Sequence, residues 1–184
     1  MSRLTAVNHE AAEGKTKELL DAVKKQIGFA PNLMKTLAQS PNTMEAYLNF
    51  SGTLGYTLNA KLREEIALLS AEANGCGYCA SAHTAIGKMV GLSDEQTLAA
   101  REGRGSDAKN DAGLKFAKAI LEKRGKVSDE DLETVKNAGF SEGEISEIVA
   151  NVALNIFTNY FNVTAQTEID FPKVELPLKR SANA

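Results

Sequence analysis

The sequence contains no tryptophan, only two cysteines, two histidines and four prolines. Two cysteines cannot form the disulfide framework with which small secreted domains replace a hydrophobic core. No apolar run approaches the ~20 residues that a membrane-spanning helix needs, and the stretch MSRLTAVNHEAAEGK has no apolar segment typical of a signal peptide. We therefore expect a cytoplasmic protein with no membrane partner.

The sequence also lacks a cluster of basic residues. The net charge is −3, and the 21 lysines and arginines are scattered along the chain. Proteins that bind nucleic acid usually concentrate such residues on one face, so we expect no nucleic-acid partner. With 43% hydrophobic and 24% charged residues, the chain has the composition of a soluble globular protein. Its length is sufficient for one core, and we expect a single domain over residues 1–184.

Patterns typical of β-strands are missing as well. Apolar residues recur at helical spacing, and no run of alternating β-branched residues appears, so the predicted fold class is all-α. Caps, glycines and prolines predict helices over residues 9–26, 32–39, 42–54, 60–73, 76–90, 94–103, 107–123, 129–137 and 142–161. An extended tail fixed by Pro172 and Pro177 is expected after the last helix.

The helix predicted over residues 60–73 is apolar on several faces. Leu62, Ile66 and Leu69 form one stripe, and alanines and a further leucine occupy the neighbouring faces. A helix that is apolar all round is normally buried, so this one is expected at the centre of the protein. Asn59 is a candidate N-cap, and the Asn-Gly pair at 74–75 is a candidate left-handed stop.

Both cysteines and one of the two histidines lie close together. The stretch NGCGYCASAHT at 74–84 places Cys76, Cys79 and His83 at positions i, i+3 and i+7, on one face of a helix. The first turn of a helix carries unpaired amides and a partial positive charge, which favour a thiolate and lower a cysteine pKa below its free value of ~8.5. The cluster therefore indicates a dithiol with nucleophilic or redox chemistry.

Two other interpretations of the pair stay open. The cysteines can be a buried, reduced pair that behaves as two small hydrophobic side chains. They can also bind zinc together with His83 and a carboxylate from Glu64 or Glu72. Structural zinc usually takes four cysteine or histidine ligands, however, and His9 is the only other histidine. We favour dithiol redox chemistry and expect no metal or cofactor.

Thiolate attack on a peroxide or a disulfide also needs groups that exchange protons. His83 can mediate, and the helix over residues 60–73 supplies Glu64, Glu65 and Glu72 as candidate bases. A carboxylate in an apolar setting has a raised pKa that suits this role. On a helical wheel, Glu65 and Glu72 flank the apolar stripe whereas Glu64 points nearly opposite. Spacing alone does not choose among them, and an ordinary solvated charge is the alternative for Glu65.

The segment that contains these glutamates and cysteines resembles the signature of a known family. The run REEIALLSAEANGCGYCASAHT resembles the signature of the carboxymuconolactone decarboxylase superfamily, and within it the alkylhydroperoxidase D branch. In that signature a glutamate is followed twelve residues later by Cys-x-x-Cys-x-x-x-His, which Glu64, Cys76, Cys79 and His83 match. The stretches GFAPNLMKTLAQSP before it and LNIFTNYFNVTAQTEIDFP after it resemble peroxidase-related members, so the resemblance covers nearly the whole chain.

The resemblance implies a fold, an assembly and an activity. The fold is all-α with a central helical hairpin, the assembly is a homo-oligomer, trimer or hexamer, and the activity is thiol-dependent reduction of hydroperoxides. It implies that Cys79 attacks the peroxide, that Cys76 donates a proton and closes the disulfide, and that Glu64 and His83 relay protons. The implied partners are a hydroperoxide substrate and a thiol reductant. The candidates for the reductant are a lipoyl protein and a thioredoxin-like protein.

Physical chemistry and the resemblance agree only in part about these roles. The helix terminus favours ionisation of Cys76, whereas a histidine one turn away favours Cys79, and we follow the resemblance. Tyr78 stands where some members have a second histidine, which removes a proton carrier. Glu72, four residues before Cys76, can either join the relay or repel the thiolate.

Three other functions remain as alternatives. A dithiol-disulfide oxidoreductase acting on protein or lipoyl disulfides would use the same pair. A carboxymuconolactone decarboxylase-type enzyme would share the scaffold without needing the thiols, so both cysteines argue against it. A zinc-stabilised helical protein without enzymatic activity is the third.

The last predicted helix carries an unusual polar stripe. It consists of Asn151, Asn155, Thr158 and Asn162, with Asn159 beside them. The opposite face is apolar and contains Ile145, Ile148, Val152 and Ile156. A solvent-exposed face would normally carry lysine and glutamate. We therefore interpret the amides as hydrogen-bonding groups across a subunit interface, with plain solvent exposure as the alternative.

Overall fold

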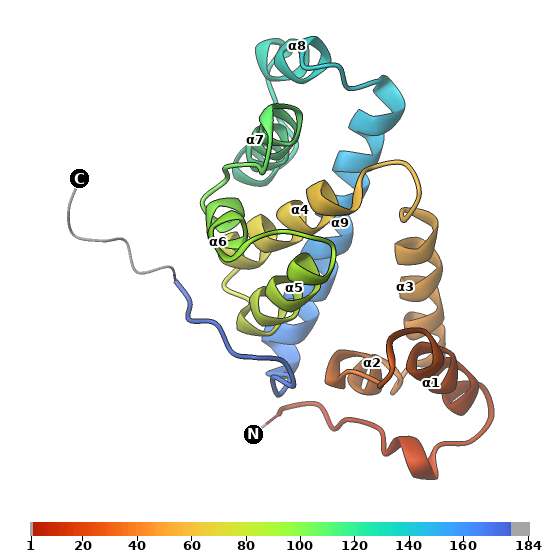
Figure 1. Cartoon of the computed structure of the whole chain (residues 1–184). Helices are drawn as coiled ribbons and strands as arrows, with labels where there is room; N and C mark the ends of the chain where they lie inside the picture. Colours follow the sequence, from red (N-terminus) through yellow and green to blue (C-terminus); the bar gives the residue numbers. More distant parts are fainter. Residues whose placement is uncertain (1, 178–184) are drawn as a thin grey trace.

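The computed structural model describes residues 2–177, and over this range it contains helices and no strands (Figure 1). The predicted all-α class is confirmed. The elements are η1 His9–Ala11, α1 Gly14–Ile27, α2 Asn32–Leu37, α3 Pro41–Thr53, α4 Ala60–Ala73, α5 Gly77–Met89, α6 Asp94–Arg101, α7 Ala108–Lys123, α8 Asp129–Asn137 and α9 Glu142–Ala165. Residues 178–184 of the predicted tail lie outside the described residues.

Predicted helix boundaries differ from the structure mainly at the two ends of the chain. The first helix begins at Gly14 rather than at residue 9, because Asn8 caps a separate 3-10 turn and Glu13 is extended. The last helix continues to Ala165, four residues beyond the predicted end at 161, and stops at Gln166 in the left-handed conformation. The α4 helix has its predicted bounds, with the side chain of Asn59 accepting a hydrogen bond from the Leu62 amide.

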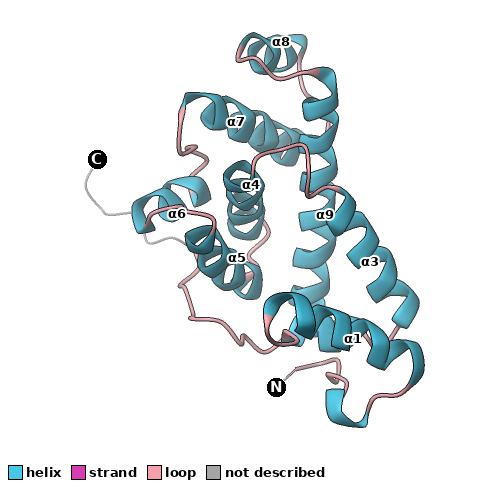
Figure 2. Cartoon of the chain, turned by 45° about the vertical axis from the view of Figure 1, so that its right-hand side comes forward, coloured by secondary structure: helices cyan, strands magenta, loops and turns pink. Residues whose placement is uncertain are grey.

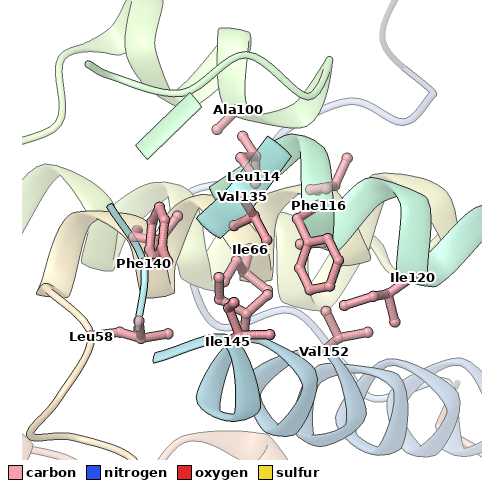
Figure 3. Packing of buried hydrophobic residues seen from close by; sticks show 14 of the residues in the cluster. Leu58, Ile66, Ala100, Leu114, Phe116, Ile120, Val135, Phe140, Ile145 and Val152 are labelled. Carbon is pink, nitrogen blue, oxygen red and sulfur yellow. The ribbon is translucent and has the colours of Figure 1, made fainter. Parts of the chain in front are cut away.

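The α4 helix lies at the centre of the protein, as its apolar faces predict. It packs against α5, α6, α7 and α9, and Figures 1 and 2 show these helices around it. Leu62, Ile66 and Leu69 contribute to a core cluster shared with α7, α8 and α9, part of which Figure 3 shows. The leucine stripe of α4 therefore faces α7 and α9.

A second core cluster lies on the other side of α4 and contains both cysteines. Ala71 of α4 packs there with Cys76 and Cys79, and the N-terminal helices contribute Leu20 of α1 and Met44 of α3. These N-terminal side chains are fully buried. The helices that precede α4 thus cover the region of the cysteines.

Glu65 is a buried carboxyl group within α4. Its side chain is 0% exposed, and Oε1 accepts a hydrogen bond of 2.7 Å from the Ser106 amide. Its Oε2 atom has no hydrogen-bond partner in the structure. Burial raises the pKa of Glu65 above its ordinary value, because the charged form is poorly solvated. The interpretation of Glu65 as a solvated surface charge is therefore wrong.

The raised pKa of Glu65 predicts a pH-dependent effect of its replacement by glutamine. A carboxyl group whose folded pKa is raised weakens folding as the pH rises from the unfolded pKa toward the folded one. The free energy of unfolding of Glu65→Gln, relative to the wild type, should therefore increase between pH 4 and pH 8. The expected increase is about 1.4 kcal/mol for each unit by which folding raises the pKa.

Urea unfolding at pH 4, 6 and 8 measures this effect. Any constant penalty from the new amide cancels, because only the change with pH is compared. Glu18→Gln, at an exposed position of α1, is the control and should show little change with pH. A difference between Glu65→Gln and the wild type that stays constant across the three pH values would contradict the prediction.

Candidate active site

The cysteines lie where a short turn joins α4 to α5. Gly75 adopts a φ of +65° in this turn, a conformation that favours glycine, and the predicted stop after α4 is confirmed. The Cys76 amide donates a hydrogen bond of 2.9 Å to the carbonyl of Ala71, which ties the turn back to α4. Cys76 is the N-cap of α5, and its Sγ accepts a hydrogen bond of 3.2 Å from the Cys79 amide. Both sulfur atoms therefore belong to the first turn of the helix.

The two cysteines form a disulfide bond in the structure. Their Cα atoms are 5.3 Å apart, which is within the normal range for a disulfide. The residues are 1% and 2% exposed, so the bond is covered by the surrounding helices. The turn and the first residues of α5 thus hold the two sulfur atoms close enough to be joined, which the redox interpretation requires.

Glu64 and His83 form a hydrogen-bonded pair across α4 and α5. The Nδ1 atom of His83 lies 2.7 Å from Oε2 of Glu64, and both side chains are partly buried. On the helical wheel, Glu65 and Glu72 flank the leucine stripe of α4, whereas Glu64 points nearly opposite. The stripe faces α7 and α9, so Glu64 on the opposite side is the carboxylate that reaches His83.

The other two candidate glutamates are held elsewhere. Oε2 of Glu72 accepts hydrogen bonds from Nε and Nη2 of Arg101 in α6, at 2.9 and 2.7 Å. Arg101 also donates to the carbonyl of Glu175, so this ion pair fastens the C-terminal segment to the helices. Glu65 is held by the Ser106 amide. The positive charge of Arg101 compensates the charge of Glu72, which reduces any repulsion of a thiolate.

Tyr78, between the two cysteines, has a structural role in this arrangement. Its hydroxyl accepts a hydrogen bond of 3.1 Å from the Leu33 amide of α2, and its ring packs edge-on against Phe171. Burial raises the pKa of Tyr78 far above its ordinary value. The tyrosine thus fastens α5 to α2 and to the C-terminal segment, and it stays protonated near neutral pH.

A small cavity lies next to the Glu64–His83 pair. Its volume is about 80 Å³, and neither cysteine is among the residues that line it. The lining residues come from α3, α4, α5 and α9: Tyr47, Ser51, Arg63, Glu64, Ala67, His83, Asn151, Leu154, Asn155 and Thr158. Burial raises the pKa of Tyr47, and the negative charge of Glu64 adds to the shift. Most of these lining side chains are polar, so the cavity is suited to a small polar molecule.

The amide stripe of α9 lies inside the protein rather than on its surface. All five of its side chains are less than 7% exposed, so the alternative of plain solvent exposure is wrong. Asn151 and Asn155 line the cavity, and each donates a hydrogen bond to a carbonyl of its own helix. The interpretation of these amides as contacts across a subunit interface is also wrong, because α4 and α5 of the same chain cover them.

Two asparagines of the stripe contact the turn that carries the cysteines. Oδ1 of Asn159 accepts a hydrogen bond of 3.0 Å from the side chain of Asn74. Nδ2 of Asn162 donates a hydrogen bond of 3.3 Å to Sγ of Cys79. Sequence reasoning missed this contact. The signal was the amide spacing along α9, but the sequence did not show which helices the stripe faces.

Two general properties of the described chain bear on the alternatives. Within residues 2–177, no group of three or more histidine, cysteine, aspartate or glutamate side chains is arranged to hold a metal ion. Over the same residues, none of the helices combines the length and the apolar character needed to cross a membrane.

Comparison with known proteins identifies relatives of this fold. Residues 41–123 match the carboxymuconolactone decarboxylase family. A peroxidase-related protein from Ralstonia eutropha JMP134, described as an alkylhydroperoxidase AhpD core, superposes with a TM-score of 0.82 at 23% identity over 92% of each chain. A peroxidase-related protein from Silicibacter sp. TM1040 gives 0.77 at 22% identity over 89% of this chain and 91% of that one.

A third structural neighbour has a different activity. The C82A variant of the debrominase Bmp8, in complex with 2,3,4-tribromopyrrole, superposes with a TM-score of 0.76 at 22% identity over 92% of each chain. No curated protein sequence matches the chain. The family match runs from the first residue of α3 to the last of α7 and includes Glu64, both cysteines and His83. Residues 41–123 thus match the carboxymuconolactone decarboxylase family, and the fold of the chain is that of the alkylhydroperoxidase D-like proteins.

Proposed function

We propose that the protein is a thiol-dependent peroxidase that reduces hydroperoxides through Cys76 and Cys79, with Glu64 and His83 as the proton relay. The observation that carries the proposal is the disulfide at the start of α5 together with the Glu64–His83 hydrogen bond between α4 and α5. The peroxidase-related neighbours support it at the level of the family. No metal or cofactor is needed for the reaction.

The reaction begins from the reduced dithiol. The Cys79 thiolate attacks one oxygen of the hydroperoxide, the O–O bond breaks, and the alcohol leaves with a proton from the relay. This step leaves a sulfenic acid on Cys79. The sulfur of Cys76 then attacks Cys79, water leaves, and the disulfide forms. The two thiols have supplied the two electrons that reduce the hydroperoxide. A thiol reductant then reduces the disulfide back to two thiols.

Glu64 has a defined effect on His83 in this scheme. Because its carboxylate accepts the hydrogen bond from Nδ1, the neutral imidazole carries its proton on Nδ1 and leaves Nε2 free. The Nε2 atom can therefore take a proton from a thiol and return it to the leaving oxygen. The cavity beside the pair supplies the space from which a small peroxide approaches the relay.

The burial of the disulfide bears on the reductant. Both cysteines are almost fully covered in the oxidised form, so a reductant must deliver its thiol into the protein. A dithiol on a long arm, as in a lipoyl protein, fits this requirement better than a thioredoxin-like protein, whose thiols would need close contact between two surfaces. The alternative of a dithiol-disulfide oxidoreductase uses the same cysteine pair, and relative rates distinguish it.

The proposed reaction predicts a defined stoichiometry of oxidation. One equivalent of hydroperoxide should remove both thiols of the reduced chain and yield the Cys76–Cys79 disulfide by mass spectrometry. Cys79→Ser should abolish peroxide consumption, whereas Cys76→Ser should stop at a sulfenic acid on Cys79 that dimedone traps. A disulfide substrate that is consumed much faster than any hydroperoxide would instead support the oxidoreductase.

The proposed reaction also predicts the effect of disrupting the proton relay. Glu64→Gln and His83→Asn should each slow peroxide reduction by about 10²-fold, the lower end of the range for general acid–base catalysis. His83→Asn should also change the pH profile of the rate, because asparagine cannot carry a proton between the thiol and the leaving oxygen. Stopped-flow kinetics between pH 5 and pH 9 measure both effects. Glu133→Gln, at an exposed position of α8, is the control, and equal losses in all three variants would contradict the relay.

We also propose that copies of the chain associate through the outer face of α9. The amide stripe is internal, but the opposite side of this helix exposes apolar side chains at helical spacing. They are Val149, Phe157, Tyr160 and Val163, which are 46%, 40%, 59% and 46% exposed. Such a row on a helix surface is typical of an interface between protein chains. A second copy of the chain is the occupant that the expected homo-oligomer supplies.

Light scattering after size-exclusion chromatography tests this association. The wild type should elute as a trimer or hexamer of the 19.7-kDa chain. Tyr160→Asp combined with Val163→Asp should produce smaller species, because charges are expensive to bury without partners. Ser146→Asp, on an exposed polar part of α9, should leave the mass unchanged. A monomeric wild type, or a double variant of unchanged mass, would refute the proposed interface.

A further inference from the structure

Asn162 differs from the other asparagines of α9 in what its side chain contacts. Its Nδ2 donates to Sγ of Cys79 at 3.3 Å, whereas Asn151 and Asn155 donate to carbonyls of their own helix. The residue is only 3% exposed, and its Oδ1 is buried without a hydrogen-bond partner. The side-chain amide of Asn162 therefore has its nitrogen hydrogen-bonded to the Cys79 sulfur and its oxygen unpaired.

The orientation of this amide follows from the chemistry of the disulfide. A disulfide sulfur carries no hydrogen and can only accept, so Nδ2 rather than Oδ1 must face Cys79. The buried Oδ1 then lacks a donor in the oxidised state, which is unfavourable. Donors appear in the other states of the pair, because a thiol carries an S–H and a sulfenic acid carries an O–H. The amide is thus better satisfied when the disulfide is open.

We propose that Asn162 is a catalytic residue that stabilises Cys79 in two states of the cycle. In the reduced state, Nδ2–H donates to the thiolate and lowers the pKa of Cys79. After attack on the peroxide, Oδ1 accepts from the O–H of the sulfenic acid and holds it until Cys76 displaces the oxygen as water. The second role rests on the proposed function, whereas the first requires only the dithiol.

This assignment resolves the competition between the two cysteines. The helix terminus favours ionisation of Cys76, whose sulfur already accepts from the Cys79 amide. Asn162 supplies a matching donor to Cys79 from α9, outside the helix that carries both thiols. Hydrogen bonds to a charged acceptor are stronger than those to a neutral one, so the donor favours the thiolate over the thiol. Cys79 then also benefits from His83, one turn further along α5.

Titration of the Cys79 thiol tests the first role without any peroxide. Titratable groups on the elements packed around the cysteines include Glu64, Glu65 and Glu72 of α4, Tyr78 and His83 of α5, Tyr47 of α3 and Asp170 of the C-terminal segment, and none of them is changed in the variants. In a Cys76→Ser background, the thiolate absorbance near 240 nm gives the pKa of Cys79 alone. Asn162→Leu should raise this pKa by about one unit, the typical effect of losing a hydrogen bond to a charged group.

Asn162→Asp keeps the shape of the side chain and replaces the donor by a carboxylate. The pKa of Cys79 should therefore rise further than in Asn162→Leu, because a negative charge beside the sulfur disfavours the thiolate. At a pH below the Cys79 pKa of both proteins, the alkylation rate should fall about tenfold in Asn162→Leu, since one pKa unit is there a tenfold change in the thiolate fraction. Asn110→Leu is the matched control, because this equally buried amide bonds Asn59 and Ser106 instead of a sulfur. Circular dichroism verifies that each variant is folded.

The outcomes separate this inference from the proposed function. An unchanged Cys79 pKa in folded Asn162→Leu and Asn162→Asp, or an equal rise in Asn110→Leu, would overturn the role of Asn162. A raised pKa in the Asn162 variants supports it even if the wild type consumes no peroxide, in which case only the proposed function fails. If peroxide is consumed, dimedone trapping in the Cys76→Ser background should show a shorter-lived sulfenic acid in Asn162→Leu than in Asn110→Leu.

Discussion

The close packing of α5 against the alanine-lined side of α4 is the constraint on which the candidate site depends. Ala67 and Ala71 follow Glu64 at helical spacing on this side, and their small side chains let α5 approach. The approach brings His83 within hydrogen-bond distance of Glu64. The turn that makes it possible also leaves Cys76 as the N-cap of α5, with Cys79 one turn inside the helix. One packing arrangement thus determines the positions of both cysteines and of the Glu64–His83 pair.

The α9 helix completes the site with polar side chains, and this is unusual for a buried helix face. Such a face is tolerated only where its polar groups find partners. Asn151 and Asn155 find them in their own helix, whereas Asn159 and Asn162 find them in the turn and on Cys79. Among the amides of this face, Nδ2 of Asn159 and Oδ1 of Asn162 have no hydrogen-bond partner, and both belong to side chains that contact the cysteine turn or Cys79 itself.

Local signals in the sequence predicted much of this arrangement and failed where tertiary contacts decide. The bounds of α4, the cap at Asn59 and the place of both cysteines in the first turn of α5 depend on nearby residues, and the structure agrees. The choice of Glu64 depends on which side of α4 receives α5, and only the resemblance indicated it. The amide stripe was visible as a pattern, but its direction depends on how α9 packs. Sequence periodicity shows that a face is distinctive without showing what covers it.

The candidate site and much of the cavity beside it come from different helices. The α4–α5 hairpin supplies the dithiol, Glu64 and His83, which are the sources of electrons and protons in the proposed reaction. The cavity walls come largely from α3 and α9, through Tyr47, Ser51 and the asparagines. A debrominase and peroxidase-related proteins share this fold, so the fold alone does not determine the reaction. In this chain the walls are mostly polar and enclose a small volume, which agrees with the proposal of a small hydroperoxide as the substrate.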